Sequence, residues 1–348
     1  MRQINDDLVL IADLQKERLY EDEPIVTDIY ASDFLPDARI SGALEVTLDG
    51  ERIFLGEHFE LAGGLQKLVS LNIKPKKATG KTHVSTLAVR FVSGEVDVCN
   101  SWKLWIYPRA EMKDAPEGVY VTDALDETVF EKLAAGNTVV LNYSYMAPQN
   151  KWNVLSAIER FKPCIWDRGS NLGGIIQNEK VQAVLGDDRY FDRNMQPLLD
   201  LGSKINLDNW PCKVTTHILG VDKPVRDRYR VQRDGVKGFV PEDTLRNFSH
   251  LFSFKVGEGN LIVSTMNVQN VENPVVSNSL SYIVANADSL RSDCGISAEA
   301  FKAWLEAENS KEFRPEDTMN KMWTDDKIPV EKVLFWEDLN MNLAAIKA

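Results

Sequence analysis

Cysteine and histidine are scarce in this sequence and widely spaced. The 348 residues include only four cysteines and four histidines, and no two cysteines form a C-x-x-C pair. Disulfide frameworks and structural zinc sites need such residues at short, regular spacings. The sequence therefore predicts no disulfide scaffold, no metal site and no other cofactor.

Long apolar runs are also missing. Near the N-terminus, Leu8–Ala12 is a run of five apolar residues that directly follows Asp6 and Asp7. A secretory signal peptide would have a basic segment before a longer apolar run. A membrane-spanning helix needs about 20 apolar residues in succession, and the sequence has no such stretch. We therefore expect no membrane association and leave the localisation open.

Basic residues are outnumbered by acidic ones. The chain has 40 Lys and Arg against 52 Asp and Glu, which gives a net charge of −12. Binding to nucleic acid needs a concentrated basic surface, so a nucleic-acid partner is not expected. The hydrophobic fraction of 44% is ordinary for a folded protein. A chain of this length can form two or three domains.

Glycine-rich phosphate loops are not found either. The candidate glycine pairs in the second half are Gly173-Gly174 and Gly257/Gly259. Neither pair belongs to a G-x-G-x-x-G motif that opens a helix, so the sequence does not support binding of a dinucleotide.

The first part of the chain, residues 1–109, has the pattern of an all-β domain. Short apolar runs alternate with turn residues, and Asp49-Gly50 between two runs is a strong hairpin signal. The expected strands are Pro24–Tyr30, Ala43–Leu48, Ile53–Leu55, Leu65–Ile73, Val84–Phe91 and Val96–Tyr107. Their number and spacing predict an immunoglobulin-like β-sandwich, without the cysteine pair of true immunoglobulin domains.

Residues 110–292 show a different pattern, in which strands alternate with a helix. Val119–Thr122 and Thr138–Leu141 are short apolar strands, and a helix between them has Asp126 as its N-cap and Gly136 at its end. A strand, a helix and a strand joined by short loops form a βαβ unit with parallel strands. We expect an α/β domain with a mainly parallel sheet, a later strand at Val214–Leu219 and a closing helix at Ser279–Ala287.

A hairpin stands out near the end of this domain. Phe252, Phe254 and Val256 alternate with less apolar neighbours, which predicts a half-buried strand, and Leu261–Val263 predicts a strand buried on both faces. The residues between them, Gly257–Asn260, suit a tight turn. After it, residues 293–348 form a C-terminal extension with a helix at Ala298–Glu306 and an otherwise irregular pattern.

Candidate catalytic residues are isolated from one another in the sequence. Asn178-Glu179 has the order found at some glycosidase acid/base residues, but hydrolysis needs a second carboxylate, and none can be paired with it. Cys164 and Cys212, with His217 as the base, are the alternative for a cysteine hydrolase. Neither cysteine has the small neighbours of a nucleophile elbow, so we predict no catalytic residue.

Tryptophan is the remaining candidate for ligand contact. Trp152, Trp166 and Trp210 in the α/β part could stack on sugar rings. The competing interpretation is that they are packed core residues, since aromatic side chains dominate cores and interfaces. Both interpretations stay open from the sequence alone.

A series of segments resembles one family in the same order. Asn100–Pro108 fits the pattern Asn-x-Trp-x-x-Trp-x-Tyr-Pro and resembles the last strand of an immunoglobulin-like domain in glycoside hydrolase family 2 proteins. Further similar segments are Gly136–Leu141, Phe161–Trp166, Leu172–Ile176, Leu198–Pro211 and Phe252–Met266. The α/β part resembles a flavodoxin-like class I glutamine-amidotransferase domain that has lost its cysteine.

This resemblance implies a non-catalytic C-terminal accessory region of a β-galactosidase- or β-glucuronidase-like enzyme. The family's catalytic carboxylates lie in a (β/α)₈ barrel, and the implied partner is the barrel of the same parent protein, or a second copy in a homo-oligomer. Two alternatives remain: a carbohydrate-binding module, and a free-standing cysteine or carboxylate hydrolase.

Overall fold

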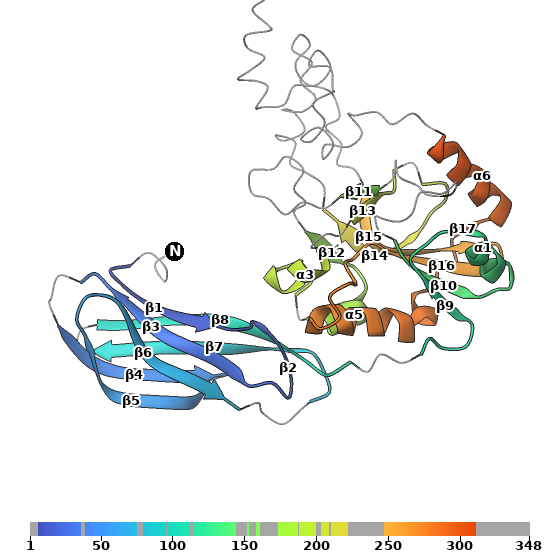
Figure 1. The fold of residues 1–348 in the computed structure, drawn as a ribbon. Helices are drawn as coiled ribbons and strands as arrows, with labels where there is room; N and C mark the ends of the chain where they lie inside the picture. The colour runs from blue at the N-terminus through green and yellow to red at the C-terminus, as the bar shows by residue number, and fades with distance from the viewer. Residues whose placement is uncertain are drawn as a thin grey trace, which may run out of the picture. The chain divides into compact units, whose positions relative to one another are not determined.

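In the computed structural model, β-strands are the main secondary structure, accompanied by some helices (Figure 1). The described residues are 6–35, 39–74, 79–94, 96–110, 114–143, 152, 158–160, 173–186, 188–199, 203–208, 210–221 and 247–310. The chain divides into two compact units: residues 1–111 with 183–187 and 273–278 form the first, and the remaining segments form the second. The predicted domain limits at 109 and 292 stay a prediction.

The first unit contains two sheets. One has the strand order β1-β3-β6, and the other has the order β2-β8-β7-β4-β5. All described pairings between these strands are antiparallel except β2 with β8. The strands are β1 (Leu8–Leu14), β2 (Arg18–Tyr20), β3 (Ile25–Asp33), β4 (Ile40–Leu48), β5 (Glu51–Leu61), β6 (Gly64–Ile73), β7 (His83–Ser93) and β8 (Val96–Tyr107).

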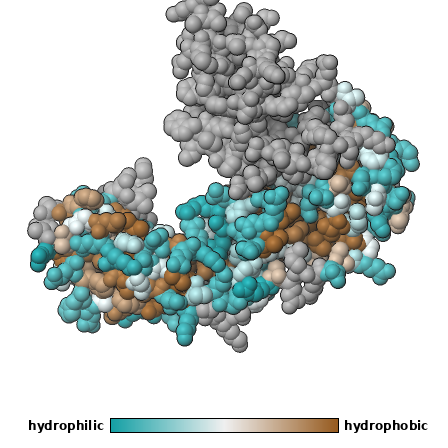
Figure 2. Space-filling view, in the orientation of Figure 1, coloured by the Kyte–Doolittle hydropathy of each residue, from teal (hydrophilic) through white to brown (hydrophobic). Residues whose placement is uncertain are grey.

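Alternation of apolar residues gives these sheets a common core. In β3 every second residue is buried, from Ile25 through Ile29 to Asp33, as expected of a strand with one face inward. Buried residues from both sheets, such as Ile29 and Phe91, belong to one core cluster. Figure 2 shows hydrophobic and hydrophilic residues interleaved on the visible surface.

The predicted Asp49-Gly50 hairpin is confirmed. Leu48 pairs with Glu51 at the ends of β4 and β5, so the loop has two residues. Asp49 and Gly50 have φ values of 52° and 78°. Two successive positive φ angles give the turn whose twist matches that of the flanking strands. Asp49 tolerates this conformation, and its carboxylate also accepts a hydrogen bond from the Thr86 amide at 2.8 Å.

The second unit is built on one mixed sheet of nine strands. Its main path is β11-β13-β15-β16-β10-β9, with β12, β14 and β17 joined beside it. The strands are β9 (Val119–Thr122), β10 (Thr138–Asn142), β11 (Ile158–Arg160), β12 (Gly174–Ile176), β13 (Ser203–Asn206), β14 (Thr215–Gly220), β15 (Phe248–Val256), β16 (Gly259–Ser264) and β17 (Gly295–Ile296).

The prediction of a mainly parallel sheet is wrong for the described strands. β9, β10 and β16 run parallel, and β17 runs parallel to β15. The other five pairings are antiparallel. For β15 and β16 the physical reason is the tight turn between them, since a two-residue connection can join only antiparallel strands.

The βαβ unit is confirmed. Helix α1 (Glu127–Ala134) connects β9 to β10, and the Asp126 carboxylate accepts a hydrogen bond from the Val129 amide at 3.1 Å. Gly136 follows the helix with a φ of 82°, a conformation that glycine adopts at helix ends without steric cost.

The later helices start where the sequence offers caps. Helix α5 (Pro274–Ala285) begins five residues before the predicted Ser279, because Asn273 caps it and proline suits the first helical position. Helix α6 (Ala298–Asn309) begins at the predicted residue, and Ser297 caps it. The remaining helices are α2 (Glu179–Leu185), η2 (Arg193–Met195), α3 (Gln196–Leu199) and η3 (Ala287–Leu290).

The β15–β16 hairpin lies at the centre of this sheet. Val256 pairs with Gly259, and Gly257 takes a φ of 60° as the first turn residue. β16 is buried on both faces, as predicted. The expectation that β15 is half-buried is wrong, because Leu251 and Ser253 on its second face are as buried as Phe252. Other parts of the chain therefore cover both faces of the central strands.

Candidate functional site

The two faces of the central strands carry different side chains. On one face, apolar residues of β10, β15 and β16 pack with α1 and α6 into a single cluster. On the other face, polar residues lie among the apolar ones; they are Thr138, Asn142, Ser253, Asn260 and Ser264, with His217 from β14. We call these the aromatic face and the polar face.

The aromatic face contains two of the three tryptophans predicted to contact sugars. Trp152 is 5% exposed and packs edge-on against Phe130, with 5.0 Å between the ring centroids. Trp210 is half-buried, with its ring 5.1 Å from Phe252 and 4.9 Å from Trp304. Trp166 lies outside the described residues. Sugar contact by these tryptophans stays a prediction, and Trp152 offers little ring surface for it.

Two further aromatic residues lie on this face, and neither is one of the three predicted sugar contacts. Phe301 is buried and packs 5.1 Å from Phe254, while Trp304 is half-buried and stacks on Phe301 at 6.0 Å. Both come from α6, where their three-residue spacing marks one side of a helix. That spacing was visible in the sequence, but the contact with Trp210 depends on the tertiary fold.

Trp210 also has a buried polar atom. Its indole Nε1 is buried and has no hydrogen-bond partner among the described residues. A buried indole N–H usually finds an acceptor. The half-buried ring of Trp210 therefore combines an apolar surface with an unsatisfied donor.

Lys302 links α6 to α1 at the margin of the aromatic face. Its ammonium lies 4.5 Å from the centre of the Phe130 ring and 5.4 Å from that of Trp152. The same group is 3.0 Å from a carboxylate oxygen of Glu127. An ammonium held over aromatic faces gains cation–π attraction, so these contacts fix α6 against the sheet. Residues 295–309 therefore pack with the second unit.

The cysteine-hydrolase alternative finds little support in the environment of Cys212. The thiol is half-buried beside the aromatic face, and burial, followed by the charge of nearby Cys294, raises its pKa to about 11. A nucleophilic cysteine needs a depressed pKa, because the thiolate is the reactive form. Cys164 lies outside the described residues.

On the polar face, three side chains form a chain that resembles a hydrolase triad in outline. His217 Nε2 is 3.0 Å from Ser253 Oγ, and His217 Nδ1 is 3.1 Å from Asn178 Nδ2. Nε2 also lies 3.1 Å from the Leu290 carbonyl, which can only accept a hydrogen bond. The proton therefore resides on Nε2, while Nδ1 accepts from the Asn178 amide.

This protonation state does not suit catalysis. A base that activates serine must present an unprotonated nitrogen to the hydroxyl, whereas Nε2 donates here. Burial lowers the pKa of His217, and Ser253 is fully buried. The Asn178–His217–Ser253 chain is therefore a buried structural network, which the sequence could not reveal because its members come from separate elements.

Asn178 and Glu179, the weak glycosidase candidate, have a local structural role. The Asn178 side-chain oxygen accepts hydrogen bonds from the amides of Lys180 and Val181 at 3.0 and 3.3 Å. Such bonds satisfy the free N–H groups at a helix start. Asn178 therefore caps α2, and Glu179 occupies the first turn.

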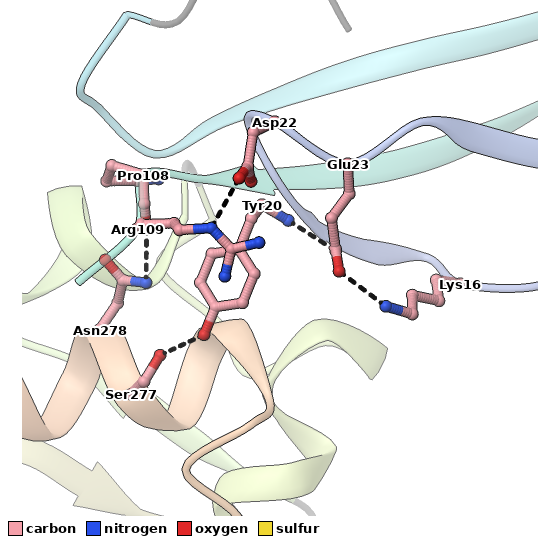
Figure 3. A network of polar contacts seen from close by, with 8 residues as sticks. All are labelled: Lys16, Tyr20, Asp22, Glu23, Pro108, Arg109, Ser277 and Asn278. Carbon is pink, nitrogen blue, oxygen red and sulfur yellow. Dashed lines mark hydrogen bonds and ion pairs between the residues drawn. The ribbon is translucent and has the colours of Figure 1, made fainter. Parts of the chain in front are cut away.

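A separate polar network lies in the first unit (Figure 3). The Arg109 guanidinium donates to Asp22 at 2.7 Å and covers the Tyr20 ring at 4.5 Å. The Tyr20 hydroxyl shares a 2.8 Å hydrogen bond with Ser277, and the Asn278 amide donates to the Pro108 carbonyl at 3.1 Å. Lys16 and Glu23 pair nearby at 2.8 Å. These contacts hold residues 273–278 to the strand ends of the first unit.

Metal ligands do not gather in the part of the chain that the structure describes. No group of three or more His, Cys, Asp or Glu side chains there could hold a metal ion. Among the same residues, no helix is both long and apolar enough to cross a membrane.

Comparison with known proteins gives limited information. No protein-family model matches the chain, and no curated protein sequence matches it. The chain has partial, low-identity structural similarity to a β-glucuronidase from Parabacteroides merdae, with 14% identity, a TM-score of 0.23 and coverage of 40% of this chain and 21% of that one. The matched part is thus about a fifth of that enzyme's length.

Two other solved structures show similarity at the same level. A GH2 β-galacturonidase from Eisenbergiella tayi has 13% identity and a TM-score of 0.18, over 39% of this chain and 28% of that one. The sporulation control protein Spo0M from Bacillus subtilis has 10% identity and a TM-score of 0.22, over 70% of this chain and 90% of that one.

Proposed function

We propose that this chain is a non-catalytic accessory region of a glycoside hydrolase family 2-like enzyme. In this proposal the first unit is an immunoglobulin-like sandwich, and the second is an amidotransferase-like α/β domain without its nucleophile. The region braces the catalytic barrel of the same parent protein, forms one wall of its sugar cleft, or joins two copies.

The observation that carries the proposal is the position of the family-like segments in the fold. Asn100–Pro108 covers the end of β8, the last strand of the first unit. Gly136–Leu141 covers β10, the second parallel strand of the next unit. Phe252–Met266 covers the central hairpin. The resemblance thus falls on core elements of both units, in the order that it implies.

The direct test is an assay of the purified chain against aryl β-glycosides. We expect no turnover above background, because the proposal assigns the paired carboxylates to a barrel elsewhere in the parent protein. Turnover that disappears after a single carboxylate change, with Glu179→Gln as the first variant, contradicts the proposal. Glu258→Gln, in the β15–β16 turn, is the matched control.

A second test examines the gene. We expect the reading frame that contains Met1 to continue upstream into a (β/α)₈ barrel. Removal of the present region from the longer protein should then lower its glycosidase activity or change its oligomeric state. A stop codon and promoter directly before Met1 would argue against this arrangement.

The environment of Trp210 favours a second candidate function, that of a carbohydrate-binding module. Its half-buried ring and unpartnered indole N–H are suited to a sugar, which offers both C–H groups and hydroxyl acceptors. Titration with plant cell-wall oligosaccharides should then show saturable binding that Trp210→Ala removes. Trp102→Ala is the matched control, because Trp102 is also half-buried but belongs to the sandwich. No saturable binding to any sugar would count against this function.

A further inference from the structure

Two neighbouring polar atoms at the end of the parallel strands are buried without partners. Ser264 is fully buried, and its Oγ has no hydrogen-bond partner among the described residues. The same holds for the buried side-chain oxygen of Asn142. Nearly all buried polar atoms in proteins are satisfied, so each exception needs an explanation such as a bound molecule.

The two atoms are placed to act together. Asn142 is the last residue of β10, Ser264 is the last residue of β16, and the two are direct partners in the parallel register. Paired residues on adjacent strands point to the same face, and the strands lie about 4.8 Å apart. One ligand oxygen atom could therefore reach both side chains through O–H···O hydrogen bonds, whose usual length is about 2.8 Å.

The chemistry of the pair selects a hydroxyl group. The Asn142 oxygen can only accept, whereas the Ser264 hydroxyl can donate. A ligand hydroxyl donates to Asn142 and accepts from Ser264, and it satisfies both atoms at once. The location also fits, because open α/β sheets bind ligands beyond the carboxyl ends of their parallel strands.

We propose that the carboxyl ends of β10 and β16 form a binding site for a small hydroxyl-bearing molecule, held by Asn142 and Ser264. The site is on the polar face of the sheet, whereas Trp210 packs on the aromatic face. It is therefore distinct from the sugar contact considered for Trp210, and it does not depend on the accessory role.

The test is calorimetric titration of the full chain with glycerol, myo-inositol, D-glucose and D-galactose. We expect at least one of these probes to bind saturably and to raise the melting temperature. Ser264→Ala and Asn142→Leu should each weaken that binding at least tenfold. Trp210→Ala should leave it unchanged, which separates this site from a carbohydrate-binding module.

Ser253→Ala is the matched control. Ser253 is also a fully buried serine on the polar face, but its hydroxyl is bonded to His217. This variant should lower the melting temperature of the free protein and keep its affinity for the probe. Ser264→Ala should not lower the melting temperature, because it removes no observed hydrogen bond.

Two results would overturn the proposal. The first is the lack of saturable binding to all four probes, which would leave a buried water molecule as the partner of both atoms. The second is binding that Ser264→Ala and Asn142→Leu do not weaken, which would place the ligand elsewhere.

Discussion

The aromatic and polar faces of the second unit's sheet use alternate residues of the same strands for different purposes. On β15, Phe252 and Phe254 join the aromatic face, while Ser253 between them bonds to His217 on the polar face. Packing on the aromatic face depends on shape and buried area, whereas the polar face depends on specific hydrogen bonds. Substitutions on the two faces should therefore differ in size, in pH dependence and in tolerance of similar residues.

The largest effect should come from the aromatic face. Phe301 is buried between the rings of Phe130 and Phe254. Phe301→Ala should destabilise the protein by about 3–5 kcal/mol, because truncation of a buried phenylalanine loses apolar burial and leaves a cavity. Urea unfolding followed by tryptophan fluorescence measures the change.

The control for this prediction is Ala303→Ser, on the exposed side of the same helix. An exposed substitution of this kind should change the stability by less than about 0.5 kcal/mol. If Phe301→Ala is as mild as its control, α6 does not belong to the core of the second unit.

The next largest loss of stability should come from the polar face, on substitution of Asn260. Its amide donates to the Ser292 carbonyl at 2.8 Å, and its oxygen accepts from the Ser292 amide at 3.2 Å. Asn260→Ala should cost about 2–3 kcal/mol, because it leaves two buried backbone groups unsatisfied. Chemical denaturation measures the loss.

Asn286→Ala provides the comparison for Asn260. Asn286 makes a single part-buried hydrogen bond from its side chain to the Tyr282 carbonyl. We expect this variant to lose about 1 kcal/mol or less. Equal losses of stability in the two variants would show that the two hydrogen bonds of Asn260 contribute no more than the single one of Asn286.

His217 should make the polar face sensitive to acid. Burial lowers its pKa from the ordinary value of 6.5, and the groups that face it, from Asn178, Ser253 and Leu290, are uncharged. Below about pH 6.5 the unfolded chain therefore binds a proton that the folded chain does not. The stability of the folded protein consequently decreases as the pH decreases. The free energy of unfolding should therefore decrease as the pH is lowered from 7 to 5.5, and urea unfolding at each pH measures this loss.

The His217→Gln variant isolates this contribution from that of the acidic residues. Its stability should be lower than that of the wild type at pH 8, but the difference should narrow as the pH falls from 7 to 5.5. A constant difference across that range would show that His217 titrates equally in the folded and unfolded states.

Local features of this fold were predictable from the sequence, and distant pairings were not. Asp126 and Ser297 act as helix caps, and Asp49-Gly50 forms a turn, because each depends on residues within a few positions. The direction of the strands beyond the βαβ unit was predicted incorrectly, because pairing between distant segments has no local signal.

The candidate sites show the same limit. The tryptophans could be named from the sequence, but the contact of Trp210 with Trp304 joins two distant segments. The pairing of Asn142 with Ser264 follows only from the register of β10 and β16. Neither residue could be selected from the sequence, because their pairing joins two distant segments.

The smallest predicted effect is a difference in thiol reactivity at the edge of the aromatic face. Cys212 is half-buried with its pKa raised to about 11, whereas Cys294 is exposed. Thiol reagents attack the thiolate, so at pH 8 Cys212 should be labelled at least tenfold more slowly than Cys294. Mass mapping of the labelled peptides distinguishes the two sites, and labelling in urea should remove the difference. Rapid labelling of Cys212 in the folded protein would restore the hydrolase alternative and show that the aromatic face is open to solvent at this edge.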